Sequence, residues 1–117
     1  MAYALLIVEQ SGDRQARSEV EGRALYERML TFSQDLKSRG LLTMSQSLAA
    51  DTNGARVRAQ GNGTAVKDGP FAEAKEMVGG FFLLTCETRE QAIAIARECP
   101  AAEWATVEVR ELGPCFT

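Results

Sequence analysis

Two short helix-capping sequences constrain the fold of this chain more than any other feature. Ser18-Glu19-Val20-Glu21 places a serine three residues before a glutamate, and Thr88-Arg89-Glu90-Gln91 repeats the pattern with threonine and glutamine. In such a capping box the first side chain accepts the amide of the fourth residue, and the fourth side chain reaches back. Each sequence therefore predicts the start of a helix.

The residues after each capping box have helical periodicity. In the first segment the apolar stripe consists of Leu25, Met29, Phe32 and Leu36, and Gly40 is the expected left-handed stop. In the second segment the apolar face consists of Ala92, Ala96 and Cys99, flanked by Ile93 and Ile95, and Pro100 ends the helix. We therefore predict one long amphipathic helix and one shorter helix.

Six other segments have the composition of strands. They are residues 3–8, 41–48, 55–60, 64–67, 77–85 and 104–109. Gly61-Asn62-Gly63 predicts a hairpin turn between the third and fourth strands. Gly79-Gly80 inside the fifth strand predicts a bulge or a close approach by another backbone. The polar stretch 9–17 is expected to be a loop.

This order of elements predicts an α+β fold. Two split β-α-β units with an added hairpin correspond to the ferredoxin-like plan, and nothing divides residues 1–117 into more than a single domain. Leu5, Val8 and the run Phe81-Phe82-Leu83-Leu84 cannot all point toward two helices on one face of the sheet. Because an exposed apolar sheet face is unfavourable, we expect a homodimer in which two sheets meet.

Composition excludes several classes of function. The chain has 117 residues, a net charge of −3 and no histidine, so a Ser-His-Asp triad, a Cys-His pair and a histidine-ligated metal site are excluded within one chain. The mild negative charge gives no reason to bind nucleic acid or an anionic membrane. No apolar run reaches membrane-spanning length, so we expect a cytoplasmic protein. The three cysteines form no metal-binding or disulfide pattern.

The sequence Asp68-Gly69-Pro70-Phe71 combines three turn-forming residues with an aromatic one. The structural interpretation is that the turn locks the connection before the fifth strand, with Gly69 in a conformation that other residues avoid and Phe71 in an apolar pocket. The functional interpretation is that the turn borders a pocket between helix and sheet. The ligand-binding candidates are then Asp68, Pro70, Phe71, Glu73 and Lys75. The same turn provides the catalytic candidate, because Asp68 would be the general base if it is buried.

Weaker candidates occur in and beyond this turn. The spacing of Asp68, Glu73 and Glu76 matches no metal-binding loop, and no metal or cofactor is expected. Arg56 and Arg58, with Lys67 across the hairpin, form a small cationic edge whose charges are typical of a guarded sheet edge. Hydroxyl groups suited to line a cavity are carried by Tyr3, Tyr26, Ser45 and Ser47, whose positions the sequence leaves open.

Residues 67–82 carry a resemblance to a known family. The core Asp-Gly-Pro-Phe-Ala-Glu-x-Lys-Glu, followed by Gly-Gly-Phe, resembles the DGPF-domain proteins of the YCII-related superfamily; the opening Tyr-x-Leu-Leu-Ile strand and the terminal Val-Glu-Val-Arg strand agree with it. The resemblance implies a ferredoxin-like subunit that dimerises as an α+β barrel. It also implies an association with extracytoplasmic-function sigma factors, because genes of this family are often found beside theirs.

One departure from the superfamily bears on activity. Its better-known branch carries a histidine on the first helix, paired with an aspartate; the equivalent position here falls near Met29, and Asp68 is the candidate for the aspartate. We therefore expect a small-molecule-binding or accessory domain. The alternatives are a cofactor-independent isomerase, lyase or monooxygenase-like enzyme that uses Asp68, and an interaction module for a sigma factor.

Overall fold

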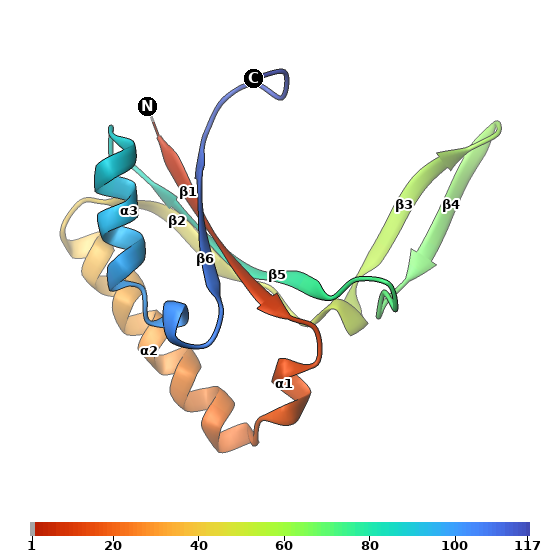
Figure 1. Cartoon of the computed structure of the whole chain (residues 1–117), viewed down its shortest axis with the longest axis horizontal. Helices are drawn as coiled ribbons and strands as arrows, with labels where there is room; N and C mark the ends of the chain where they lie inside the picture. Colours follow the sequence, from red (N-terminus) through yellow and green to blue (C-terminus); the bar gives the residue numbers. More distant parts are fainter. Residues whose placement is uncertain (1) are drawn as a thin grey trace.

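The computed structural model describes residues 2–117 and has the predicted mixed α+β architecture (Figure 1). Its strands are β1 (Tyr3–Gln10), β2 (Leu42–Ser47), β3 (Ala55–Gln60), β4 (Gly63–Asp68), β5 (Glu76–Leu84) and β6 (Thr106–Glu111). Its helices are α1 (Asp13–Ala16), α2 (Glu19–Ser38) and α3 (Arg89–Glu98), with short 3₁₀ turns at Asp51–Asn53 and Pro100–Glu103.

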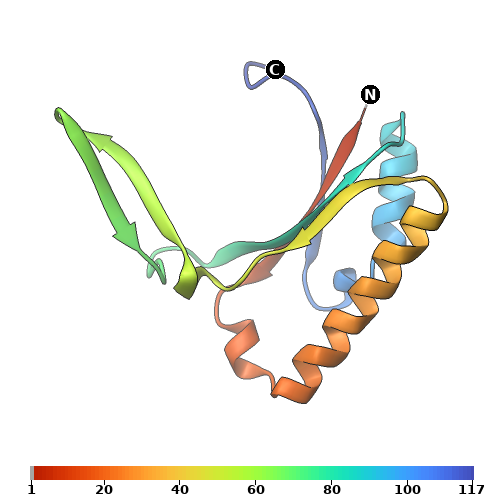
Figure 2. The same cartoon turned by 180° about the vertical axis from the view of Figure 1, so that it is seen from behind.

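Four strands form the main sheet in the order β2-β5-β1-β6. Every neighbouring pair is antiparallel. With β3 and β4 set aside, this is the strand order of the ferredoxin-like plan, so the predicted fold class is confirmed. Figures 1 and 2 show α2 and α3 on the same face of the sheet.

The remaining two strands form a separate hairpin that extends away from the main sheet (Figure 2). Arg56 lies opposite Lys67 and Val57 opposite Val66, and both valines are 64% exposed. The radius of gyration is 16.0 Å, against about 13 Å for a compact chain of this length. The projecting hairpin accounts for this larger radius of gyration.

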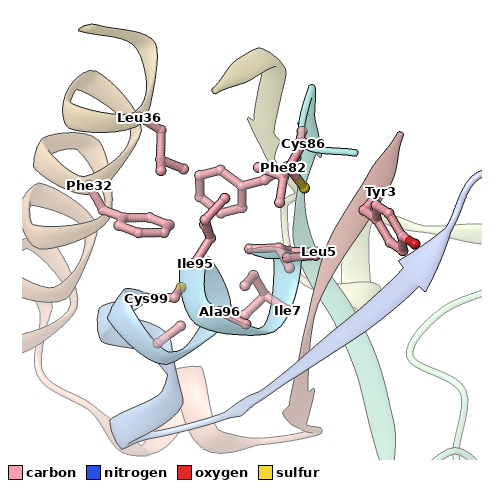
Figure 3. Packing of buried hydrophobic residues seen from close by; sticks show 13 residues of the cluster. Tyr3, Leu5, Ile7, Phe32, Leu36, Phe82, Cys86, Ile95, Ala96 and Cys99 are labelled. Carbon is pink, nitrogen blue, oxygen red and sulfur yellow. The ribbon is translucent and has the colours of Figure 1, made fainter. Parts of the chain in front are cut away.

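The core lies between the sheet and the two long helices (Figure 3). Leu5 of β1, Phe82 of β5 and Leu36 of α2 meet there, and Phe32 packs edge-on against Phe82 with ring centroids 5.4 Å apart. Ala92, Ile95 and Ala96 contribute the buried face of α3. The second half of α2 is thus fixed by the core.

The helix ends follow the predicted capping chemistry. Ser18 Oγ accepts the amide of Glu21, and the Glu21 carboxylate accepts the amide of Ser18, so the capping box is complete. Thr88 accepts the amide of Gln91. Gly40 follows α2 with φ of 71°, as expected for a left-handed stop.

The prediction of a loop at residues 9–17 is wrong. Strand β1 continues through Glu9 and Gln10, which pair with Met77 and Glu76 of β5, and α1 follows after Gly12. A glutamate at the end of an apolar strand indicated a surface residue. Here the Glu9 side chain is only 7% exposed because Arg14 neutralises it inside the fold.

Within residues 2–117, no helix covers the second face of the sheet (Figures 1 and 2). Leu6 and Phe81 lie opposite each other on this face, as do Met44 and Leu83. Met44 is 45% exposed and Val78 43% exposed. The prediction that the apolar strand residues divide between two faces is therefore confirmed.

Candidate functional site

The candidate site is a cavity of about 240 Å³ between the middle of α2 and the sheet. Its apolar lining includes Ile7, Leu25, Met29, Leu30, Phe82, Ala101 and Trp104; its polar lining includes Glu9, Arg14, Arg17, Tyr26, Ser33, Ser45, Gln46 and Ser47. The volume is close to the lower end of ligand pockets, about 300 Å³. The cavity therefore suits a small molecule with both apolar and polar parts.

A nearly buried ion pair lies in the wall of this cavity. Arg14 Nε donates to Glu9 Oε1 at 2.7 Å and Arg14 Nη2 donates to Glu9 Oε2 at 3.1 Å. The same guanidinium donates to the carbonyl oxygens of Leu48 at 2.8 Å and Gly79 at 3.2 Å. Arg14 thereby ties α1 to β1, β5 and the end of β2, and both oxygens of Glu9 are occupied.

The paired glycines of β5 make room for these contacts. A Cβ on Gly79 would lie 2.0 Å from Glu9 Oε2 and 2.8 Å from Arg14 Nη2, and a Cβ on Gly80 would lie 3.0 Å from the Gln46 carbonyl oxygen. The register also shifts between Ile7 and Val8, where Gly79 is the extra residue. The predicted bulge and close approach are both present.

Hydroxyl groups line the part of the cavity between α2 and β2. Ser33 Oγ and Ser45 Oγ are 2.8 Å apart and share one hydrogen bond. Because each serine carries one proton, the pair keeps one O–H that can donate into the cavity. Ser47 and Tyr26 also line the cavity, whereas Tyr3 lies in the core and burial raises the pKa of its phenol.

A cluster of charged and aromatic groups braces the far end of the cavity. Arg28 of α2 donates to both carboxylate oxygens of Glu103 and lies over the Trp104 ring, 5.5 Å from its centroid. The hydrogen bond to Arg28 lowers the pKa of Glu103, and the same bond raises the pKa of Arg28. These contacts hold Trp104 against the cavity.

The residues predicted from the Asp68–Phe71 turn lie outside this cavity. Asp68 ends β4 and is exposed, as are Pro70, Glu73 and Lys75. Phe71 is 8% exposed, with the Arg56 guanidinium 3.9 Å from its ring centroid, and lines a separate hollow with Val8 and Met77 at the base of the hairpin. The turn thus packs on the hairpin, and it borders this second hollow instead of the helix–sheet cavity.

Contacts around the turn show what its residues do structurally. A Cβ on Gly69 would lie 1.9 Å from the Asp51 carbonyl oxygen. Gly69 does not have a positive φ, so it is required by this close approach and not by an unusual backbone conformation. Lys67 Nζ donates to both carboxylate oxygens of Glu73, at 2.9 and 3.1 Å, and this hydrogen bonding lowers the pKa of Glu73.

Sequence reasoning missed five polar residues of the cavity: Glu9, Arg14, Arg17, Ser33 and Gln46. The signal for Glu9 was available, since Tyr3, Leu5, Ile7 and Glu9 alternate along one face of β1. A carboxylate that continues a buried face requires a cationic partner. Arg14, five residues later, is such a partner.

Two further observations concern the helices and the metal-binding side-chain types. No helix within residues 2–117 is long and apolar enough to cross a membrane. Among the same residues, no group of three or more histidine, cysteine, aspartate or glutamate side chains is arranged to hold a metal ion.

The fold and cavity define a small ferredoxin-like α+β protein with a pocket between helix and sheet. A family model for the YCII-related domain matches residues 1–115, so the chain belongs to the YCII-related family. It is similar to the uncharacterized protein R00369 of Rhizobium meliloti (strain 1021), with 32% identity over 115 residues that cover 97% of this chain and 93% of the relative.

Proposed function

We propose that this chain binds a small organic molecule in the cavity between α2 and the sheet. The observation that carries the proposal is the change in packing along α2. Phe32 and Leu36 are buried in the core, whereas Leu25 and Met29 on the same stripe are only partly buried and line the cavity, with Met29 also packed against the core. A helix that buried its whole stripe for stability alone would leave no such space, because protein interiors are close-packed.

The lining groups favour binding over catalysis. Both oxygens of Glu9 accept hydrogen bonds from Arg14, so this carboxylate is held as part of the wall. Ser33 and Ser45 bond each other, and neither is paired with a base that would activate it. The alternative of an enzyme that uses Asp68 stays a prediction; the exposure of Asp68 does not favour it, because a general base needs a site that excludes water.

A fragment screen with a blocked variant tests the proposal. Leu30 lies at the cavity and is 37% exposed, so Leu30→Trp places a larger side chain across the opening. Val20→Trp, on the exposed surface of the same helix, is the matched control. Fragments should raise the melting temperature of the wild type and of Val20→Trp, but not of Leu30→Trp. Equal shifts in all three proteins, or no shift in the wild type, would contradict the proposal.

We also propose that two copies pair through the helix-free face of the sheet. The observation that supports pairing is the exposure of apolar residues on this face, such as Met44 and Val78. A dimer would remove the apolar face from water, which is favourable by about 25 cal/mol per Å². Association with a sigma factor stays a prediction from the resemblance described above.

A further inference from the structure

We infer that the ligand of the helix–sheet cavity is a small amphipathic monocarboxylate whose charge is bound by Arg17. This inference depends on the ligand-binding function proposed above and adds the chemical class of the ligand. It follows from the balance of charges around the cavity and from the distribution of its apolar groups.

Arg17 is a cation without a direct partner at the mouth of the cavity. Within residues 2–117 its guanidinium makes no side-chain hydrogen bond and no ion pair, although it is half-buried. Together with Arg14 and Tyr26, it lines the cavity and two neighbouring hollows between α1 and α2. A ligand that enters from this side passes Arg17.

The other charges nearby are already matched. Glu9 pairs with Arg14, and Glu19 pairs with Arg23 at 2.8 Å. Glu21 accepts hydrogen bonds from Ser18 as part of the capping box, and Arg17 contributes only the smallest of the effects that lower its pKa. Arg14, Arg17 and Arg23 balance the charges of Glu9, Glu19 and Glu21, but within residues 2–117 the Arg17 guanidinium donates to no carboxylate, so its hydrogen-bonding groups are available to a single carboxylate on the ligand. A dianion would bring an unmatched charge into a partly dry site, which is costly.

The remaining lining indicates the other parts of the ligand. Leu25, Met29 and Phe82 provide an apolar wall, and Trp104 adds an aromatic face. The free proton of the Ser33–Ser45 pair is suited to a carboxylate or carbonyl oxygen. The cavity volume corresponds to about eight water molecules at about 30 Å³ each. A one-ring aromatic acid or a short-chain fatty acid has this size and polarity.

Arginine is also the side chain best suited to this role. Its planar guanidinium binds a carboxylate through two parallel hydrogen bonds, whereas a lysine provides only a point charge. The positions of Arg17 and of the apolar wall therefore predict an orientation, with the carboxylate toward α1 and the apolar part toward Trp104.

Titration of the whole chain with benzoate, benzamide and phenyl phosphate tests the inference. Benzoate should bind at least about tenfold more tightly than benzamide and more tightly than phenyl phosphate. Arg17→Gln should remove the preference for benzoate and leave benzamide binding unchanged, and Arg17→Lys should give an intermediate result. Arg97→Gln, on the exposed surface of α3, makes the same change in charge away from the cavity and should bind as the wild type does.

The outcomes separate this inference from the proposed function. Equal binding of benzoate and benzamide, or a preference that survives in Arg17→Gln, would overturn the monocarboxylate assignment while the cavity still binds ligand. Tighter binding of phenyl phosphate than of benzoate would overturn the inference that the ligand carries a single negative charge. Absence of binding by every probe, together with a negative fragment screen, would overturn both. Arg17→Lys keeps the test valid if Arg17→Gln does not fold.

Discussion

Replacing Gly79 by alanine tests whether the buried ion pair shapes the cavity wall. The φ of Gly79 is not in the left-handed region, so alanine can adopt the backbone conformation. A glycine-to-alanine change without contacts would stabilise the chain by about 0.4–1 kcal/mol through the unfolded state. Here the new Cβ would lie 2.0 Å from Glu9 Oε2, so the carboxylate must leave Arg14.

The magnitude follows from the environment of the pair. Breaking a buried ion pair costs about 3–5 kcal/mol when one charge is left without a partner. The Glu9 side chain is 7% exposed, but Arg14 is 29% exposed and can be partly rehydrated. We therefore expect Gly79→Ala to reduce the free energy of unfolding by about 3 kcal/mol, at the lower end of that range.

Urea denaturation followed by the fluorescence of the single tryptophan, Trp104, measures this change. Gly22→Ala is the matched control, because nothing lies within 4 Å of its added Cβ inside α2, and alanine should stabilise the helix by about 1 kcal/mol. In a double-mutant cycle, Glu9→Ala should relieve at least about 1 kcal/mol of the cost of Gly79→Ala. A Gly79→Ala protein within about 0.5 kcal/mol of the wild type, or a cycle without coupling, would refute this reasoning.

Two further predictions concern the helix cap and the open sheet face. Ser18→Ala should lower the free energy of unfolding by about 1 kcal/mol at neutral pH. Hydrogen bonds from Ser18 hold the pKa of Glu21 below its ordinary value of 4.5, so the part of the stabilisation that comes from the Glu21 carboxylate is present above that pH and is lost as the pH falls through the lowered pKa. The difference between wild type and Ser18→Ala should therefore narrow on acidification in chemical denaturation, and a constant difference would argue against the capping box as its source. Phe81→Asp on the open face should convert a dimer to a monomer in analytical ultracentrifugation, while Val57→Asp on the hairpin should not; a wild type that is already monomeric at micromolar concentration would refute pairing through this face.

Much of the fold could be predicted because local chemistry and global architecture agree. The capping box at Ser18, the side-chain cap at Thr88 and the stop at Gly40 are local signals; the box at Ser18 is complete, Thr88 accepts the amide of Gln91 without the reciprocal bond, and Gly40 has the expected positive φ. The division of Leu5 and Phe81 between two sheet faces follows from the period of a strand. These features depend only on neighbouring residues, which a sequence displays directly.

The candidate site could not be predicted in the same way, because it depends on contacts between distant segments. Arg14 reaches the carbonyl oxygens of Leu48 and Gly79, which lie 34 and 65 residues away in the chain. The residue types of the Asp68–Phe71 turn predicted an unusual backbone conformation at Gly69, yet what requires this glycine is the close approach of the Asp51 carbonyl oxygen. A glycine can be required because its backbone has a positive φ or because another atom lies where a Cβ would be, and the sequence does not distinguish the two.

The uneven support of α2 has a consequence for its motions. Its C-terminal turns are held in the core by Phe32 and Leu36, whereas Leu25 and Tyr26 of its earlier turns line the cavity. Local opening should therefore cost less free energy toward the N-terminal turns, and amide hydrogen exchange should slow progressively from Leu25 toward Leu36. A ligand can then enter the cavity when only the N-terminal turns of α2 move and its C-terminal turns stay in place.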